Sequence, residues 1–203
     1  MRIHFEGLDL AGKSTVCRLF REHARGQWQV RRNALVPDNP IYDLADRLRK
    51  AGTGEESVGW LYYAALLLDL EQYQPTADEL IQDSTILLRS LAFHTVRGTA
   101  GLVDRLERLL DRHPRFDRSF VLVADHQTRL ERLAKRRPHN LGPEDFLVRD
   151  QPERFYAMER RLIDYATRHF GAVVLDTSGE LDAAWLEQIF RHLPGLRRDQ
   201  ASA

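Results

Sequence analysis

A glycine-bounded segment near the start of the chain has the residues of a phosphate-binding loop. Residues 5–15 read FEGLDLAGKST, which contains the complete pattern G-x-x-x-x-G-K-S. In such a loop, successive backbone N–H groups point inward and hold phosphate oxygens together with the N-terminus of the following helix. The segment predicts a nucleoside triphosphate site formed by Gly7, Leu10, Ala11, Gly12, Lys13, Ser14 and Thr15.

Three side chains in or beside this loop have distinct expected roles. We expect the Lys13 ammonium to reach the β- and γ-phosphates and the Ser14 hydroxyl to ligate Mg²⁺. Asp9 lies inside the loop at a position that binds no triphosphate oxygen and can face an acceptor. A solvated turn carboxylate is the alternative interpretation of Asp9.

Charged residues farther along the chain extend the predicted site. Asp83 ends a short apolar segment, where a carboxylate can hold Mg²⁺ or accept a proton from an attacking hydroxyl. Arg132 and Arg136 are four residues apart, so on a helix they share one face and can both point at phosphates. The polar segment from about 136 to 152 then predicts a lid that excludes water during phosphoryl transfer. The alternative is a solvated helix face with Glu131 as the ion-pair partner.

The elements that must position these residues alternate along the chain. Strands are expected at residues 3–6, 28–31, 80–83, 119–124 and 172–175. Helices are expected at residues 14–23, 42–50, 57–73, 85–96, 102–111, 127–136, 153–169 and 181–192. This order predicts an α/β P-loop three-layer fold, with a five-stranded parallel sheet, helices on both faces and an arginine-rich lid. The active site then lies over the carboxyl ends of the strands.

One of these helices differs from the others in its pattern. The segment 57–73 is apolar nearly all round, which predicts a central buried helix. The same kind of apolar helix could also supply the interface of a homodimer.

Length and composition limit the classes of protein that fit. The 203 residues, 43% of them hydrophobic, indicate one domain over residues 1–194 and a frayed tail over 195–203. The formal net charge is zero, so no whole-molecule field attracts nucleic acid or an anionic membrane. No apolar run approaches the roughly 20 residues that span a bilayer. The lone Cys17 is expected in the core and fits a reducing cytoplasm.

With these residues and elements in view, the chain resembles the thymidylate kinase family. That family typically opens with E-G-x-D-G-A-G-K-S/T-T, from which this chain departs at Leu10 alone. The segments YYAA (62–65), SLAF (90–93) and GAVVLDTSGELDAAWLEQI (171–189) are similar to later elements of the family. The resemblance implies a nucleotide-kinase fold with ATP as donor and Mg²⁺ as cofactor. It also implies that Asp9 contacts the acceptor's sugar hydroxyl and that Thr177 and Ser178 lie near the donor's adenine.

Two departures from the family pattern concern the acceptor. Where the family has an aspartate-arginine pair after its alanines, this chain has Leu66 and Leu67, and Ser84 replaces the arginine after Asp83. Two cations that would bind an acceptor monophosphate are therefore missing. The available replacements are Arg32, Arg89 and Arg97.

Together these features predict an ATP-dependent phosphotransferase with a small-molecule acceptor. The acceptor is a nucleoside, a nucleoside monophosphate or a related metabolite, and a neutral hydroxyl compound such as a sugar-like metabolite is the competing choice. A nucleotide-binding regulatory protein with little transfer activity is a further alternative. A GTPase is disfavoured because the chain has no N-K-x-D motif.

Overall fold

Five parallel strands form the sheet at the centre of the molecule. The computed structural model describes residues 1–75, 79–137 and 141–196. The strands are β1 (Arg2–Glu6), β2 (Gln29–Arg32), β3 (Leu80–Asp83), β4 (Arg118–Val123) and β5 (Val173–Asp176). They lie in the order β2-β3-β1-β4-β5, and each neighbouring pair is parallel. The predicted five-stranded parallel sheet is confirmed.

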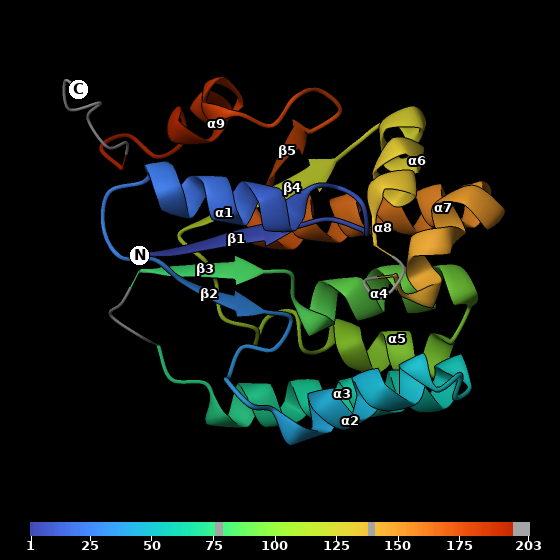
Figure 1. Ribbon diagram of the computed structural model, residues 1–203. Coiled ribbons are helices and arrows are strands. Elements are labelled where there is room, and N and C mark those ends of the chain that lie inside the picture. The colour runs from blue at the N-terminus through green and yellow to red at the C-terminus, as the bar shows by residue number, and fades with distance from the viewer. Residues whose placement is uncertain (76–78, 138–140, 197–203) are drawn as a thin grey trace.

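Helices cover both faces of this sheet (Figure 1). The α-helices of the described residues are α1 (Lys13–His23), α2 (Pro40–Lys50), α3 (Glu55–Gln72), α4 (Ile86–Arg97), α5 (Ala100–Glu107), α6 (His126–Lys135), α7 (Leu147–Asp150), α8 (Pro152–Phe170) and α9 (Ala183–Phe190). α1 and α9 pack on one face of the sheet. α4 and α8 pack on the other face and against each other. This is the predicted three-layer arrangement.

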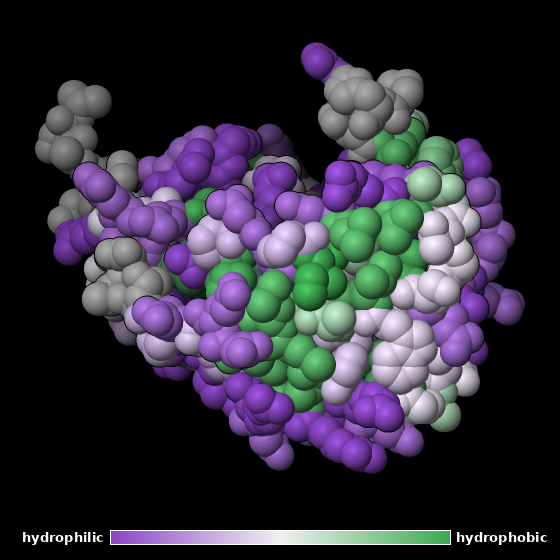
Figure 2. All heavy atoms as spheres, turned by 90° about the horizontal axis from the view of Figure 1, so that it is seen from below, coloured by the Kyte–Doolittle hydropathy of each residue, from purple (hydrophilic) through white to green (hydrophobic). Residues whose placement is uncertain are grey.

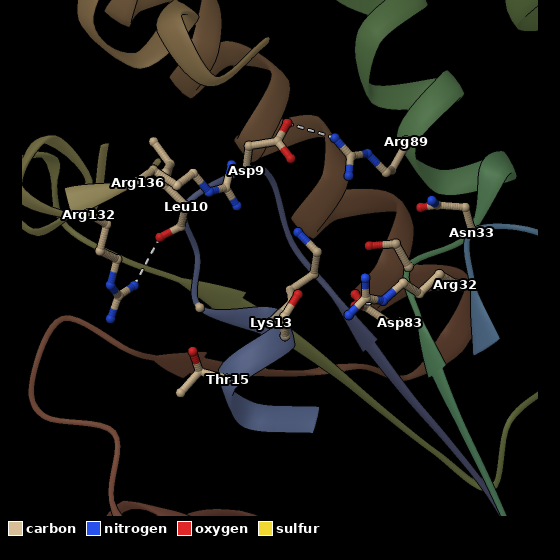
Figure 3. A pocket seen from close by; sticks show the side chains of 13 residues that line it. Asp9, Leu10, Lys13, Thr15, Arg32, Asn33, Asp83, Arg89, Arg132 and Arg136 are labelled. Atoms are coloured by element: carbon tan, nitrogen blue, oxygen red, sulfur yellow. Dashed lines mark hydrogen bonds and ion pairs between the residues drawn. The ribbon is translucent and has the colours of Figure 1, made fainter. Parts of the chain in front are cut away.

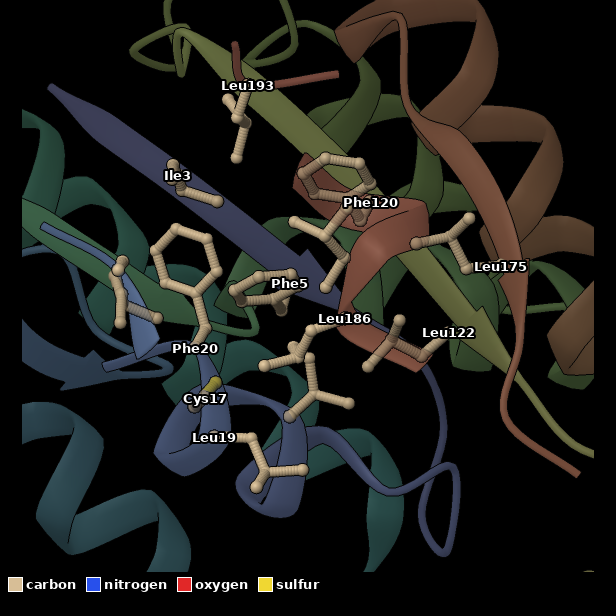
Figure 4. Packing of buried hydrophobic residues seen from close by; sticks show 14 of the residues in the cluster. Ile3, Phe5, Cys17, Leu19, Phe20, Phe120, Leu122, Leu175, Leu186 and Leu193 are labelled. Carbon is tan, nitrogen blue, oxygen red and sulfur yellow. The ribbon is translucent and has the colours of Figure 1, made fainter. Parts of the chain in front are cut away.

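The core beneath α1 fixes the start of that helix relative to the sheet. Phe5 of β1 lies between Phe20 of α1 and Phe120 of β4, with ring centroids 5.9 Å and 5.5 Å from its own (Figure 4). Aromatic side chains bury large apolar areas, so this cluster holds α1 firmly on the strands. Cys17 lies in the same cluster, as predicted, and burial raises the pKa of its thiol.

The prediction of a central buried helix at 57–73 is wrong. The corresponding helix, α3, packs against α2, α4 and α5 but lies at the outside of the molecule. Trp60 and Leu67 of α3 are 38% and 37% exposed, and Leu44 of α2 is 40% exposed. Figure 2 shows apolar side chains gathered on this face of the molecule. An apolar pattern all round a helix predicts burial, but here the chain's own elements cover only part of the surface.

Several element boundaries differ from the predicted ones because capping residues set them. α2 begins at Pro40, two residues early, where the Asn39 side chain accepts hydrogen bonds from the N–H groups of Ile41 and Tyr42. α9 begins at Ala183, two residues late, because the Asp182 carboxylate accepts from the Trp185 N–H at 2.7 Å. α5 runs over Ala100–Glu107, whereas the predicted helix covered 102–111. β2 and β5 each begin and end one residue later than predicted.

The predicted lid segment contains helical structure. Residues 138–140 of the lid lie outside the described residues. After them come a 3-10 helix, η2 (Pro143–Phe146), and the short helix α7. The Asp145 carboxylate accepts from the Gly142 N–H at 2.8 Å, and Val148 is buried beside α8. The predicted polar lid segment, about 136 to 152, gave no sign of these short helices, since neither follows a long periodic pattern.

The last described residues contact the segment that follows α1. Of the predicted tail 195–203, only Gly195 and Leu196 are described, and the Leu196 carbonyl accepts from the Arg25 N–H at 2.6 Å. None of the helices in the described ranges combines the length and hydropathy needed to cross a membrane.

Candidate active site

The loop between β1 and α1 has the backbone geometry of a phosphate cradle. Gly7 has φ +149°, and a Cβ added there would meet the Leu122 carbonyl oxygen at 2.5 Å. Gly12 has φ +80°, and a Cβ there would meet Leu181 at 2.9 Å. Both positions therefore require glycine. The two glycines therefore let the loop approach the Leu122 backbone and Leu181 closely, in the turn that the phosphate-loop pattern predicts.

Leu10 adopts a left-handed conformation at the one position where the loop departs from the resembled family. Its φ is +65°, a value that favours glycine over residues with a Cβ. The Leu10 side chain is 5% exposed and packs with Leu8 and Leu88. Burial of this side chain offsets the cost of the backbone conformation, which is about 1–2 kcal/mol.

The first turn of α1 presents its N–H groups to the loop. Gly12 caps the helix without a side-chain hydrogen bond, and no acidic residue lies in the first turn. The Lys13 ammonium donates to the carbonyl oxygens of Gly7 and Leu8 at 2.7 and 3.0 Å, so it lies inside the loop. Burial lowers the pKa of Lys13. An anion placed here would meet both the open N–H groups and the ammonium.

A cleft of about 320 Å³, the loop cleft, opens beside these groups (Figure 3). It is lined by Asp9, Leu10, Gly12, Lys13, Ser14, Thr15, Arg32, Asn33, Asp83, Ser84, Arg89, Arg132 and Arg136. The cleft therefore contains the predicted loop residues Leu10, Gly12, Lys13, Ser14 and Thr15. It also contains the predicted Asp9, Asp83, Arg132 and Arg136. Gly7 and Ala11 are buried and do not line this cleft.

Asp83 and Ser14, the predicted Mg²⁺ ligands, line the same cleft from β3 and α1. Asp83 pairs in register with Phe5 of β1, which places its carboxylate beside the start of the loop. Arg32 Nε lies 3.6 Å from Asp83 Oδ2. Within the described ranges, no group of three or more His, Cys, Asp and Glu side chains forms a cage for a metal. One carboxylate and one hydroxyl suit Mg²⁺, which otherwise retains water and phosphate oxygens.

Asp9 forms an ion pair with Arg89 in the loop cleft. Arg89 Nη2 donates to Asp9 Oδ2 at 2.8 Å. Burial alone would raise the pKa of Asp9, but the charges of Arg89 and Lys13 outweigh it and lower the pKa to about 2. Asp9 is therefore an ionised, partnered carboxylate, and the alternative of a solvated turn residue does not hold.

Arg132 contacts the loop directly. Its guanidinium donates to the Leu10 carbonyl at 3.0 Å and to Thr177. Glu131 instead accepts from Gln127, so the alternative of a solvated Arg132–Glu131 pair is wrong. Arg136 also lines the loop cleft and pairs with Asp145 of the lid.

Thr177 and Ser178 lie behind the loop and are not part of the described cleft lining. The Thr177 hydroxyl is buried, 3.0 Å from the Ala11 carbonyl oxygen and 2.9 Å from that of Val123. Ser178 Oγ accepts from the Asp125 N–H at 2.8 Å. Both residues thus support the loop and α6, and their position near an adenine stays a prediction.

Leu66, Leu67 and Ser84 stand where the resembled family pattern has other residues, and they differ in burial and in contact with the clefts. Leu66 is fully buried and Leu67 is exposed, and neither lines a described cleft. Ser84 lines the loop cleft with φ +66°. The three arginines available as replacements are already paired: Arg32 with Asp83, Arg89 with Asp9, and Arg97 with Glu55.

Sequence reasoning missed Arg129, a fully buried arginine of α6. It donates to the carbonyls of Asp9 and Ala124 at 2.7 and 2.9 Å and pairs with Glu159 of α8. Arg129 therefore holds the backbone of the loop at Asp9. The available signal was its position four residues before the buried Leu133, on the apolar face of the helix.

Replacing Arg129 by Met should lower the free energy of unfolding by about 3–5 kcal/mol, because Glu159 would remain buried without its partner. Urea denaturation followed by circular dichroism measures this loss. The double variant Arg129→Met/Glu159→Gln should recover part of it, since the buried charge is then removed. A loss below about 1 kcal/mol would show that the pair is not important for stability.

The second cleft, the adjoining cleft, is larger, at about 780 Å³. Asp9, Asn33, Arg89 and Arg136 line both clefts, so they lie where the two meet. Further lining residues come from α2, α3, α4, α8 and the lid. Its volume is in the range of small-molecule sites.

Comparisons with protein-family models and with curated protein sequences found no match. Solved structures do match. Thymidylate kinase from Candida albicans has a TM-score of 0.68 at 18% identity, covering 98% of this chain and 95% of that one. Deoxyadenosine kinase from M. mycoides with bound dATP has a TM-score of 0.62 at 20% identity, covering 95% and 99%. Thymidylate kinase from Ehrlichia chaffeensis has a TM-score of 0.59 at 17% identity, covering 95% and 97%. Over nearly its whole length, the chain has the P-loop fold found in thymidylate and deoxyadenosine kinases.

Proposed function

We propose that this protein is an ATP-dependent kinase that transfers the γ-phosphoryl group of MgATP to a small molecule in the adjoining cleft. The observation that carries the proposal is the junction of the two clefts at Asp9 and Arg89. A cationic phosphate cradle opens there onto a separate cavity of ligand size. The kinase names of the similar structures support the same activity.

The residues of the loop cleft have complementary roles in this reaction. MgATP supplies the phosphoryl group, and the loop N–H groups, Lys13 and Arg132 bind its phosphates. Ser14 and Asp83 would hold Mg²⁺. Arg136 approaches from the lid and neutralises charge on the transferring group. Arg129 acts through the loop backbone, because it holds the carbonyl of Asp9.

Asp9 orients the acceptor in this scheme. Its low pKa makes the carboxylate a weak base, so it accepts a hydrogen bond from an acceptor hydroxyl and aligns the oxygen for attack. A monophosphate acceptor would need no base, and positioning alone would suffice. The nucleotide kinase scheme therefore works for either kind of acceptor.

Acceptor-dependent release of ADP tests the proposal. The panel contains nucleosides, nucleoside monophosphates and sugar-like alcohols, each incubated with protein and MgATP. We expect ADP release to rise with particular acceptors and to remain at background without them. Release that is equal with every compound would instead identify an ATPase or a regulatory nucleotide-binding protein.

We also propose a homodimer formed through the exposed apolar face of α2 and α3, in a cytoplasmic protein. Leu44, Trp60 and Leu67 expose large apolar side chains there. Light scattering after size exclusion should give twice the mass of one chain. Leu67→Glu should give a monomer, because it places a charge in the interface. Val174→Glu, at an exposed position of β5, is the matched control, and a monomeric unaltered protein would contradict the proposal.

A further inference from the structure

The residues that line the adjoining cleft include more carboxylates than cations. Among the residues that the structure describes, five carboxylates and four cations line it. The carboxylates are Asp9, Asp46, Glu55, Glu144 and Asp145, and the cations are Arg49, Lys50, Arg89 and Arg136. The loop cleft has the opposite balance, with five cations and two carboxylates.

Each of the four cations is already paired with a carboxylate that lines the same cleft. Arg89 pairs with Asp9 at 2.8 Å, and Arg136 pairs with Asp145. Lys50 and Arg49 contact Asp46 at 2.7 and 2.8 Å. Arg49 also pairs with Glu144, which joins α2 to the lid across the cleft.

A second anion in this cleft would have to compete for these pairs. A phosphate gains charge-assisted hydrogen bonds from an arginine only if the existing carboxylate partner is displaced. The displaced carboxylate would then lie beside the new anion, and like charges at close range oppose binding. In the loop cleft, by contrast, Lys13 and Arg132 donate to backbone carbonyls and to Thr177, so a triphosphate can meet these two cations without displacing a carboxylate.

The other groups around the adjoining cleft are apolar or uncharged. Val58, Tyr62, Ile86, Phe93 and Met158 provide apolar and aromatic surface. Aromatic faces of this kind suit a ring-bearing ligand.

Two uncharged polar groups of α4 also face this cleft. Ser90 lines it, and no hydrogen bond of its hydroxyl occurs within the described residues. His94 lies so close to α3 that a Cβ added at Gly59 would meet its ring at 2.4 Å. Burial lowers the pKa of His94 to about 4, so its ring is neutral at pH 7 and adds no cation.

Resting on the proposed kinase function, we infer that the acceptor is a neutral, ring-bearing alcohol and not a monophosphate. The junction of the clefts then brings its hydroxyl to Asp9 and its ring to the surface of Tyr62 and Phe93. The acceptor oxygen forms a bond to the γ-phosphorus, the bond from that phosphorus to the β,γ-bridging oxygen breaks, and ADP leaves. The hydroxyl proton passes to solvent as the new ester forms.

Binding measurements test the charge preference without requiring turnover. Calorimetry is performed with saturating Mg²⁺ and a non-hydrolysable imido analogue of ATP, which fills the loop cleft. The titrants are neutral alcohols and their monophosphates in matched pairs: thymidine, deoxyadenosine and methyl glucoside, each beside its phosphate ester. We expect at least one alcohol to bind about tenfold or more tightly than its ester.

Variants that release Arg49 provide a second measurement. In Asp46→Asn/Glu144→Gln, both carboxylate partners of Arg49 lose their charge. We expect the preference for the alcohol over its ester to fall by about tenfold. Glu144→Gln alone should give a smaller change in the same direction. Glu22→Gln, which alters the exposed pair with Arg18, is the matched control and should leave the preference unaltered.

The possible outcomes separate this inference from the proposed function. The inference would be overturned if, in every pair that binds, the monophosphate bound at least as tightly as its alcohol. It would also be overturned if no compound of any pair bound. ADP release with monophosphates alone would also overturn it, while the kinase function would stand. An alcohol that binds preferentially but gives no ADP release would support the charge preference and contradict the kinase function.

Discussion

Lys13→Ala should lower kcat/KM for phosphoryl transfer by about a thousandfold, the largest effect that we expect from one side chain. The Lys13 ammonium lies inside the loop, bound to the carbonyls of Gly7 and Leu8. No other lysine lines the loop cleft in the described part of the chain. The variant therefore loses the charge that stabilises the phosphates during transfer. Acceptor-dependent ADP release measures the loss.

The fold should survive this substitution. The Lys13 side chain is partly exposed and donates to backbone carbonyls, so its removal leaves no carboxylate without an ion-pair partner. The far-ultraviolet circular dichroism and the midpoint of thermal unfolding should remain close to those of the unaltered protein. Lys135→Ala, at an exposed position of α6, is the control and should retain activity. Turnover of Lys13→Ala within about threefold of the unaltered protein would end the proposed mechanism.

Asp83→Asn should lower kcat/KM by about a hundredfold and raise the Mg²⁺ concentration needed for half-maximal activity. Asp83 of β3 and Ser14 of α1 both line the loop cleft. An amide carries no negative charge, so it holds a divalent cation and its water less tightly. Steady-state assays over a range of Mg²⁺ concentrations measure both effects.

Arg32→Ala distinguishes a metal role of Asp83 from a role in its ion pair. Arg32 Nε lies 3.6 Å from Asp83, but its side chain is 68% exposed, so the pair adds little stability. This control should leave the Mg²⁺ dependence unaltered. An equal shift in Mg²⁺ dependence for Arg32→Ala and Asp83→Asn would assign the effect to the ion pair instead.

The part of the site that could be predicted is the part that one continuous segment forms. The loop's glycines, Lys13 and Ser14 have fixed spacing, so the pattern determines their geometry. Asp83 was also accessible, because a carboxylate at the end of a parallel strand lies at the same edge of the sheet as the loop. The three-layer fold could also be predicted, because strands that alternate with helices form a parallel sheet covered on both faces.

The residues that sequence reasoning missed depend on contacts between distant segments. Arg129 reaches Glu159 of α8 and the Asp9 carbonyl, which lie 30 and 120 residues away in the chain. Arg49 and Glu144 pair across 95 residues. Periodicity describes one helix at a time, so it cannot say which charges of two helices meet. The exposed position of α3 was missed for the same reason.

Leu10 has a consequence for how the loop meets its ligand. A glycine at this position leaves the backbone many conformations, whereas a leucine held at φ +65° by its buried side chain leaves few. In the proposed kinase, we therefore expect the loop to become ordered on folding and not on binding. Such pre-organisation would reduce the conformational entropy lost when a triphosphate binds, and the affinity of the loop would then depend on the hydrophobic contacts around Leu10.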